Sequence, residues 1–269
     1  MVLEIRNVGK AFQSKDGQVV RALSEVSLSV QEGEFVSIIG PSGCGKSTLF
    51  NIVGGLLTDH DGKVEVDGMT IQGPHREIGM VFQEESTYPW RSAIRNVELP
   101  LEIAGVAAKE RRKRAADLIK LVGLEGFEER LPRELSGGMR QRISIARTLA
   151  FQPRIMLMDE PFGALDEQTR LLLGDKILQI WQDIRQTTLL ITHNITEAVQ
   201  MSDRVVVMSH RPGRIKQIIE IDLPRPRSSE NITDKAFGDY VGMIWRDLRE
   251  EASMYLTESE APGAVAKSA

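Results

Sequence analysis

A glycine-rich segment that begins at residue 40 carries the clearest chemical pattern in this sequence. It matches G-x-x-x-x-G-K-[ST] and consists of Gly40, Pro41, Ser42, Gly43, Cys44, Gly45, Lys46, Ser47 and Thr48. Glycines in such a loop allow successive backbone N–H groups to turn inward around an anion, while the lysine supplies a positive charge and the serine hydroxyl a ligand for Mg²⁺. The segment therefore predicts a polyphosphate site. The alternative is a tight turn that binds nothing.

Two adjacent carboxylates form a second candidate for chemistry. Asp159 and Glu160 follow the apolar run from Ile155 to Met158, which reads as a buried strand. Neighbouring side chains of an extended chain point in different directions, so these two are able to do different jobs. We expect Asp159 to reach Mg²⁺, directly or through water, and Glu160 to accept a proton from an attacking water. A solvated strand cap would have the same sequence.

Two other apolar runs also end in a polar residue. Gln83 follows the run from Ile78 to Phe82, and His193 follows the run from Thr188 to Thr192. The carboxyl ends of parallel strands are where α/β sheets place ligand chemistry, so both side chains are candidates for it. Considered alone, Gln83 is equally compatible with a structural capping residue. For His193 alone, a neutral capping role is commoner than a ligand-binding one.

A second helix begins with glycine further along the chain. Ser136 is predicted as its N-cap, Gly137 and Gly138 as its first turn, and the helix continues to Ala150. The N-terminus of a helix attracts anions, because its N–H groups are unpaired and the helix dipole is positive there. The chain thus has two predicted anion-binding helix starts, which either bind two ligands or close on one ligand from opposite sides.

The elements that must position these residues alternate between strands and helices. Apolar runs and alternating patterns predict further strands over 2–8, 26–30, 205–208 and 215–221 and a hairpin over 64–71. Helical spacing predicts helices over 46–57, 109–123 and 237–248. Strands that alternate with helices around a phosphate loop favour a parallel sheet with helices on its faces.

The composition limits the kinds of protein that the chain could be. Its 269 residues and 41% hydrophobic content suit one large or two small soluble domains with a sizeable core. The longest apolar runs fall far short of the ~20 residues that cross a bilayer, and no secretory signal is visible. A net charge of −4 gives no overall basic surface for nucleic acid. The basic run at 109–114 is either a nucleic-acid patch or, more commonly, a solvated helix face.

Cys44 is the single cysteine of the sequence. The chain therefore has no internal disulfide, which suits a reducing compartment. The position of Cys44 in the phosphate loop allows a redox-sensor role, whereas the simpler interpretation is a small residue that contributes its backbone N–H.

At this point the sequence resembles a known family, the ATP-binding cassette ATPases, over nearly all of residues 1–225. The motifs occur in the order typical of that family: the phosphate loop, Gln83, the signature segment LSGGMRQR at 135–142, Asp159 with Glu160, the segment Ala164, Leu165, Asp166, and His193. The wider text resembles the branch of nitrate, sulfonate and taurine importers, namely FQEESTYPWR from Phe82, DEPFGALD from Asp159 and DLPRPR from Asp222.

The resemblance implies an α/β fold with a P-loop NTPase (RecA-like) core, an antiparallel β edge sheet and an inserted α-helical subdomain. It places the cassette at residues 1–225, with the helical subdomain at about 86–152. A C-terminal helical extension is expected at 226–256 and a disordered tail at 257–269, because the last residues are rich in Ala, Ser, Pro and Gly.

In that family two cassettes pair head to tail, and each ATP lies between the phosphate loop of one and the signature serine and glycines of the other. The resemblance thus assigns the second helix start, Ser136 to Gly138, to the partner's ATP, so that both helix starts close on one ligand. It implies these roles: Phe12 stacks on adenine, Lys46 and Ser47 hold phosphate and Mg²⁺, Gln83 senses metal and water, Glu160 is the base, Asp166 lies at the dimer contact and His193 touches the γ-phosphate.

Two residues depart from the family's usual pattern. Asn194 stands where an aspartate commonly follows the histidine, which removes one charge near the site, and we expect hydrolysis to be retained with altered coupling. Phe12 replaces the commoner tyrosine, a mild change because stacking needs only the ring.

The function that the resemblance implies is that of an importer ATPase. ATP and Mg²⁺ are the expected ligands, and the expected partners are a second copy of the chain, an integral-membrane permease and, indirectly, a solute-binding protein, but no nucleic acid. The chain would sit at the cytoplasmic face of the cell membrane and drive uptake of an oxyanion such as a sulfonate, taurine or nitrate. An apolar lip at Tyr88, Pro89 and Trp90 would receive the permease, unless Trp90 is a core residue. The alternative is a soluble cassette ATPase that acts on DNA or ribosomes.

Overall fold

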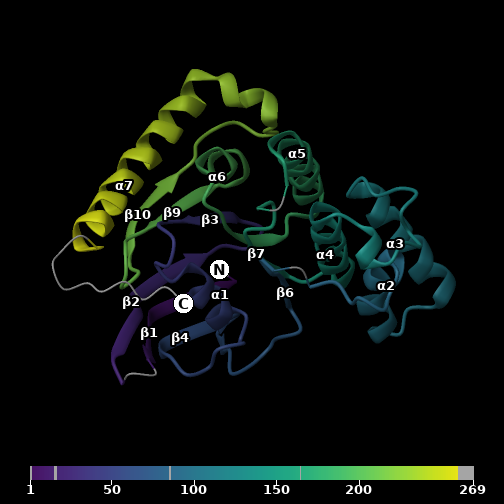
Figure 1. The fold of residues 1–269 in the computed structure, drawn as a ribbon, viewed down its shortest axis with the longest axis horizontal. Helices are drawn as coiled ribbons and strands as arrows, with labels where there is room; N and C mark the ends of the chain where they lie inside the picture. The colour runs from purple at the N-terminus through teal and green to yellow at the C-terminus, as the bar shows by residue number, and fades with distance from the viewer. Residues whose placement is uncertain (1, 15–16, 85, 164, 260–269) are drawn as a thin grey trace.

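The computed structural model describes residues 2–14, 17–84, 86–163 and 165–259, with side chains described as far as Glu251. The family-motif residue Ala164 and the predicted tail beyond residue 259 lie outside the described residues. Within the described part, the strands form a six-stranded sheet in the order β10-β9-β3-β8-β7-β6 and a four-stranded sheet in the order β2-β1-β4-β5 (Figure 1). The candidate site lies on the six-stranded sheet, and the four-stranded sheet packs on one side of that sheet.

The six-stranded sheet has a parallel core. Strands β9, β3, β8, β7 and β6 run parallel to their neighbours, while β10 pairs with β9 in the antiparallel direction. Every residue of the three central strands is buried, as expected for strands with helices on both faces. Strand β3, Phe35–Ile39, leads into the phosphate loop. The other five strands of this sheet are confirmed to within one residue at each end of the prediction: β6 Ile78–Val81, β7 Ile155–Asp159, β8 Thr187–Ile191, β9 Arg204–Met208 and β10 Ile215–Glu220.

The four-stranded sheet is antiparallel throughout, as the resemblance implied. It consists of β1 Leu3–Gln13, β2 Val19–Val30, β4 Asp61–Val66 and β5 Met69–Thr70. The sequence predicted only 2–8 of β1 and 26–30 of β2. Register shifts between Ile5 and Val8, and again around Lys10, break the alternation on which that prediction rested. The hairpin over 64–71 is confirmed by the pairing of β4 with β5.

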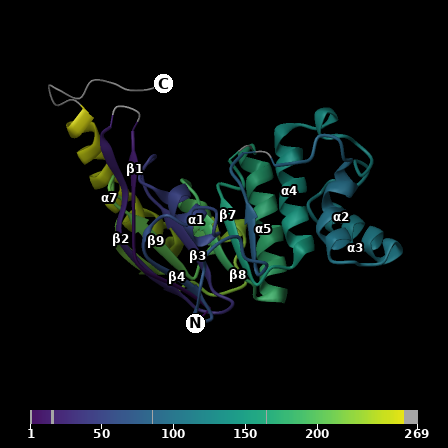
Figure 2. The same ribbon diagram turned by 90° about the horizontal axis from the view of Figure 1, so that it is seen from below.

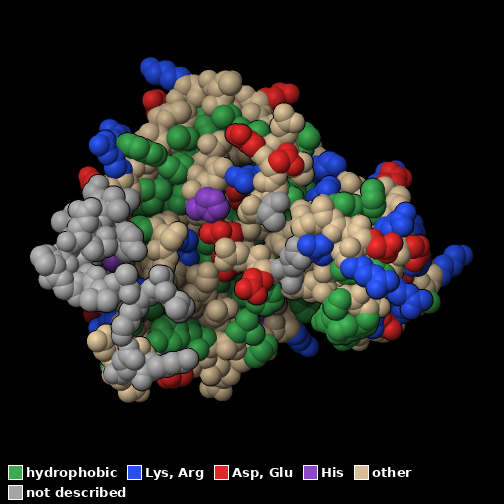
Figure 3. Space-filling view, viewed as in Figure 1, with side chains coloured by type: hydrophobic (Ala, Val, Ile, Leu, Met, Phe, Trp, Pro, Cys, Tyr) green, Lys and Arg blue, Asp and Glu red, His purple; other side chains and the backbone are tan. Residues whose placement is uncertain are grey.

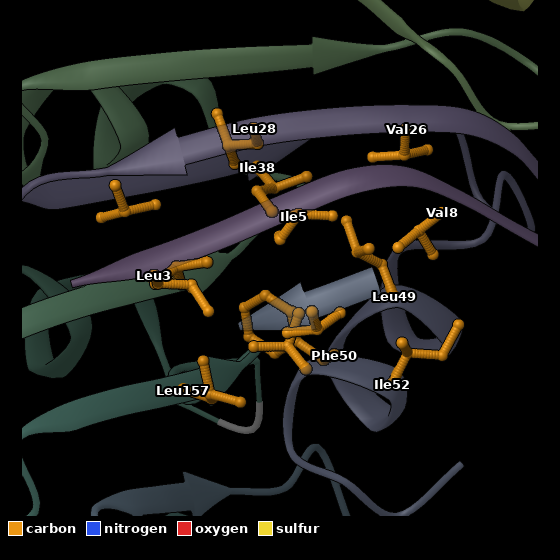
Figure 4. Close-up of a cluster of buried hydrophobic side chains, with 14 of the residues drawn as sticks. Leu3, Ile5, Val8, Val26, Leu28, Ile38, Leu49, Phe50, Ile52 and Leu157 are labelled. Atoms are coloured by element: carbon orange, nitrogen blue, oxygen red, sulfur yellow. The ribbon is translucent and has the colours of Figure 1, made fainter. Parts of the chain in front are cut away.

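Helix α1, Lys46–Val53, is enclosed between the two sheets. Its Leu49 and Phe50 pack with Ile5 of β1, Leu28 of β2 and Leu157 of β7 in one buried cluster (Figure 4). The helix is shorter than the predicted 46–57. Gly54 caps it, and Gly55 has a left-handed φ of 72° with the carbonyl of Gly73 2.0 Å from where a Cβ would stand.

A group of three helices stands to one side of the sheets (Figures 1 and 2). It consists of α2 Ala93–Ile103, α3 Ala108–Leu121 and α4 Gly137–Phe151. Their buried face is continuous with the outer face of β7, because Val97, Ile119 and Ile143 share a core with Met158. Helix α5, Glu167–Ile184, joins the same core through Leu178 and Trp181. The division of the cassette at residues 86–152 stays a prediction.

The C-terminal segment packs back on the sheet. Helix α6, Ile195–Met201, and the long helix α7, Lys235–Ser259, cover β9 and β10, and Phe237 and Ile244 of α7 are buried there. The short 3-10 helix η2, Ser229–Thr233, precedes α7. Helix α7 continues to Ser259, past residue 257 where the disordered tail was expected to begin. Among the described helices, we find none with the length and apolar character needed to cross a membrane.

Candidate active site

A cavity of about 470 Å³ opens at the carboxyl ends of the central strands. This volume is in the range of sites that hold small molecules. The cavity brings together many of the residues that the sequence predicted, and it is lined by Phe12, Val20, Ala22, Ser42, Gly43, Gly45, Lys46, Ser47, Thr48, Gln83, Glu160 and Arg211. The phosphate loop and the candidate base therefore share one site.

The phosphate loop connects β3 to α1 and begins that helix beside the cavity. Gly43 and Gly45 have left-handed φ angles of 74° and 107°, and a Cβ at Gly45 would lie 2.8 Å from the carbonyl oxygen of Ala22. Glycine is therefore needed for both conformation and packing. The Lys46 ammonium is buried and donates to the carbonyls of Gly40, at 2.8 Å, and Pro41, at 2.9 Å. Its charge is thus held within the loop.

Cys44 is buried in the same loop. Burial raises the pKa of its thiol, although the nearby Lys46 ammonium opposes this effect. A buried thiol with a raised pKa is unreactive at neutral pH. Of the two interpretations, the structure favours the small residue that contributes its backbone N–H over a redox sensor.

Asp159 ends β7 next to the start of α1. The Ser47 hydroxyl is close enough to its carboxylate to influence the pKa of Asp159, while Oδ1 is buried and has no hydrogen-bond partner among the described residues. Burial raises the pKa of Asp159 and the charge of Glu160 adds to this effect, whereas Ser47 and Lys46 lower it. A hydroxyl beside a carboxylate with an unused oxygen suits a hard cation such as Mg²⁺.

Three polar side chains from adjacent strand ends meet at Glu160. Oε2 of Glu160 accepts a hydrogen bond from Nε2 of Gln83 at 3.2 Å, and it lies 3.3 Å from Nδ1 of His193. Glu160 has a left-handed φ of 45°, which is uncommon for a side chain other than glycine. Two backbone hydrogen bonds hold this conformation: its N–H donates to Ile191, and its carbonyl accepts from Gly163. The predicted convergence of these three residues is present, while their individual roles stay predictions.

Asn194 caps helix α6 directly after His193. Its side-chain oxygen accepts from the N–H of Glu197 at 3.1 Å, and its own N–H donates to the Thr192 hydroxyl at 3.0 Å. Asparagine and aspartate are about equally good N-caps. The departure from the family's usual aspartate therefore leaves the local turn that presents His193 in place.

The comparisons with known proteins agree with this geometry. The family model described as ABC transporter matches residues 23–163, more than half of the chain. The chain belongs to the ABC transporter family. Because cassettes of this family bind and hydrolyse ATP, the chain is an ATPase.

Individual members of the family are similar over most of their length. A nitrate import ATP-binding protein of Synechocystis is 46% identical over 83% of this chain and 84% of its own length. A taurine import ATP-binding protein of Rhizobium johnstonii is 43% identical over 96% of this chain and 98% of its own. Among solved structures, a dimeric ATP-binding cassette in a post-hydrolysis state with ADP and Pi is 34% identical, with a TM-score of 0.75 over 82% of this chain and 100% of that one.

The signature segment of this ABC cassette lies apart from the cavity. The Ser136 hydroxyl caps α4 as predicted and accepts from the N–H of Met139 at 3.3 Å. Neither Ser136 nor Gly137 and Gly138 are among the residues that line the cavity. The second predicted helix start is thus present, but it does not line the cavity of its own chain.

Two lining residues differ in how well the sequence indicated them. The Phe12 ring is partly exposed and lines the cavity, with the Lys10 ammonium 5.2 Å from its centre, and its stacking on adenine stays a prediction. Arg211 was missed. It lies in a Pro-Gly turn after β9, and a basic residue at the carboxyl end of a central strand was the signal that could have found it.

Proposed function

We propose that the chain is the ATP-hydrolysing subunit of an importer for a small oxyanion, such as nitrate or a sulfonate like taurine, and that it acts at the cytoplasmic face of the cell membrane through a separate permease. The observation that carries the proposal is the meeting of the phosphate loop with Gln83 and Glu160 in one cavity, with His193 3.3 Å from the Glu160 carboxylate. The nitrate and taurine import proteins that the chain resembles support the choice of cargo class.

Glu160 acts as the general base. Gln83 and His193 approach the same carboxylate oxygen, so they fix the direction in which Glu160 accepts a proton from water. Ser47, Asp159 and Gln83 would hold Mg²⁺, which would supply positive charge near the phosphates. Lys46 exchanges its contacts with the loop carbonyls for contacts with the phosphates, and the N–H groups at the start of α1 bind the same oxygens.

A second copy of the chain completes the site. The N-terminus of α4, capped by Ser136 and opened by two glycines, is a helix start of the same anion-binding kind as the phosphate loop. Since it does not line the cavity of its own chain, we assign it to the ATP of the partner. ATP then closes the dimer, and hydrolysis releases it.

An aromatic lip, formed by Tyr88, Pro89 and Trp90, is the surface that we assign to the permease. Trp90 is 73% exposed, so the lip interpretation replaces the alternative of a core tryptophan. The loop is nevertheless fixed: the Asn96 side chain accepts from the N–H of Tyr88 at 2.8 Å and donates to the carbonyl of Arg91 at 2.9 Å. An exposed tryptophan on a rigid loop is typical of a binding hot spot.

The basic run gives no support to the alternative of a DNA-binding or ribosome-binding ATPase. Arg112 pairs with Glu129 and Glu98, and Arg114 pairs with Glu110 at 2.7 Å. Figure 3 shows acidic and basic side chains interspersed over this helical group. The run is therefore part of a mixed surface rather than a positive patch.

The catalytic assignment is tested with Glu160→Gln. We expect ATP binding to persist, turnover to fall about a hundredfold or more because the base is lost, and a dimer to accumulate in ATP. Turnover is measured by phosphate release and the dimer by size-exclusion chromatography. Glu220→Gln, an exposed glutamate at the end of β10, is the matched control. A Glu160→Gln variant that hydrolyses at the parent rate removes Glu160 from the role of base.

The import assignment is tested with Trp90→Ala in cells that also produce a candidate permease of the nitrate and taurine import class. We expect about tenfold less cassette to co-purify with the permease in detergent, as for loss of an interfacial aromatic anchor, and uptake of labelled nitrate or taurine to fall with it. Trp245→Ala on α7, where the indole is 50% exposed, is the control. Equal recovery of both variants would contradict the lip assignment, and a parent chain that joins no membrane complex would contradict import itself.

A further inference from the structure

Arg211 is held against the phosphate loop from outside the known motifs. Its guanidinium donates through Nε, at 3.1 Å, and through Nη2, at 2.9 Å, to the carbonyl of Gly43. It also lines the cavity on which Lys46 opens. A positive charge with a two-pronged contact therefore joins the turn between β9 and β10 to the loop that binds phosphate.

The turn of residues 209–214 is packed tightly enough to carry this contact. Gly213 lies so close to the loop that a Cβ would stand 2.1 Å from the carbonyl oxygen of Cys44. Its N–H donates to Ala22 and its carbonyl accepts from Ser24, both on β2. The turn is thus fixed both to the phosphate loop and to β2.

The Arg211 contact fixes one peptide plane of the loop. In a trans peptide the carbonyl of Gly43 and the N–H of Cys44 point in opposite directions. The guanidinium holds the carbonyl, while the N–H of Cys44 donates to Pro41 at 3.3 Å. Rotation of this plane would turn a carbonyl oxygen to the other side of the loop, and Arg211 opposes that rotation. Since Gly43 lacks a side chain and has a φ of 74°, an outside restraint is needed there.

The same turn is tied to the C-terminal helix. Glu251 of α7 is only 6% exposed, and its carboxylate accepts from the backbone N–H of His210 at 2.8 Å, one residue before Arg211. Lys216 of β10 pairs with Glu251 at 3.1 Å and with the adjacent Glu250 at 2.8 Å. Helix α7 lies along β10 in Figure 1, so it is in position to hold the turn along this strand.

We propose that Arg211 is a positioning residue of the phosphate loop and that α7, through Glu251, sets its position, so that the C-terminal extension tunes the affinity for ATP. The proposal rests on the cavity being the ATP site. Contacts run without interruption from Glu251 through His210 and Arg211 to Gly43. A ligand or partner that shifts α7 would change ATP binding without touching the nucleotide.

Arg211→Ala is the first test. We expect the Kd for a fluorescent ATP analogue and the KM for ATP to rise about five- to tenfold, the loss expected for a charged hydrogen bond near solvent, while kcat stays near the parent value. Arg214→Ala is the matched control, because Arg214 lies in the same turn but donates to the Ser24 hydroxyl and does not line the cavity. An affinity of Arg211→Ala equal to that of Arg214→Ala would overturn the proposal.

Glu251→Ala tests the role of α7. We expect Glu251→Ala to raise the KM for ATP about threefold because one hydrogen bond to the turn is lost. Glu251→Gln keeps an acceptor for the N–H of His210 and should have the parent KM. Glu250→Ala should also have the parent KM. In the double variant with Arg211→Ala, the Glu251 change should add nothing. A Glu251→Ala variant with the parent KM, or additive effects in the double variant, would overturn this part. Lys46→Ala separates the premises: if it keeps full ATP affinity, the ATP site itself is misassigned.

Discussion

Helices α1 and α4 of this cassette both begin next to glycines, yet only α1 begins in a cavity. At α1 the loop is enclosed by β2, the turn of residues 209–214 and the ends of β6 and β7, and the result is a cavity with a cation and a carboxylate. At α4 the same kind of start is capped by Ser136 and remains outside that cavity. The backbone alone provides affinity for an anion, whereas its surroundings decide whether the chain completes the site by itself.

The comparison predicts that substitutions at the starts of α1 and α4 impair different properties. The largest expected effect is a loss of ATP affinity at α1. Lys46→Ala should lower ATP affinity by up to about 100-fold in the monomer, since it removes charged hydrogen bonds to phosphate, and turnover should fall with it. Equilibrium binding of a fluorescent ATP analogue to dilute protein measures the loss. Lys63→Ala, an exposed lysine of β4, serves as the control. If Lys46→Ala retained the parent affinity for ATP, the start of α1 would not be the phosphate site.

Ser136→Arg should instead lower hydrolysis sharply and spare nucleotide binding to the monomer. The bulky cation would occupy the space where a partner's phosphates approach α4, so we expect turnover to fall about a hundredfold while monomer affinity stays within about twofold of the parent, as for a surface change far from the ligand. Phosphate release and monomer binding are measured on the same preparation. A drop in monomer affinity would show that the signature segment acts within its own chain.

The smallest effect concerns a buried acid behind His193. Burial raises the pKa of Glu197 to about 8, against 4.5 ordinarily, although the Thr192 hydroxyl bond and the Arg170 charge oppose this. The folded protein thus holds a proton that the unfolded chain releases, so stability should fall as pH rises from about 4.5 to about 8. Glu197→Gln, which retains an acceptor for Thr192, should flatten this decline in melting temperature. An unchanged pH profile would mean that Glu197 is ionised when folded.

The sequence predicted the central strands well because they are uniformly apolar and end in polar residues. It failed where three-dimensional packing overrides local pattern. The outer halves of β1 and β2 were missed since register shifts break their alternation, and α1 ends early because Gly55 packs against another loop. Lys46, Glu160 and His193 were found from motifs within single segments. Arg211 was not, because its partner Gly43 is 168 residues away in sequence, and only the folded turn brings them together.

The hydrogen bonds of Lys46 to its own loop carbonyls have a consequence for the energetics of nucleotide binding. In the role proposed for Lys46, an entering nucleotide competes with the two carbonyl acceptors that the chain already supplies. Binding is therefore a swap of partners, and its heat should be smaller than a count of phosphate contacts suggests. After the product leaves, the ammonium returns to those acceptors, so the cradle keeps its shape between turnovers and is ready for the next nucleotide.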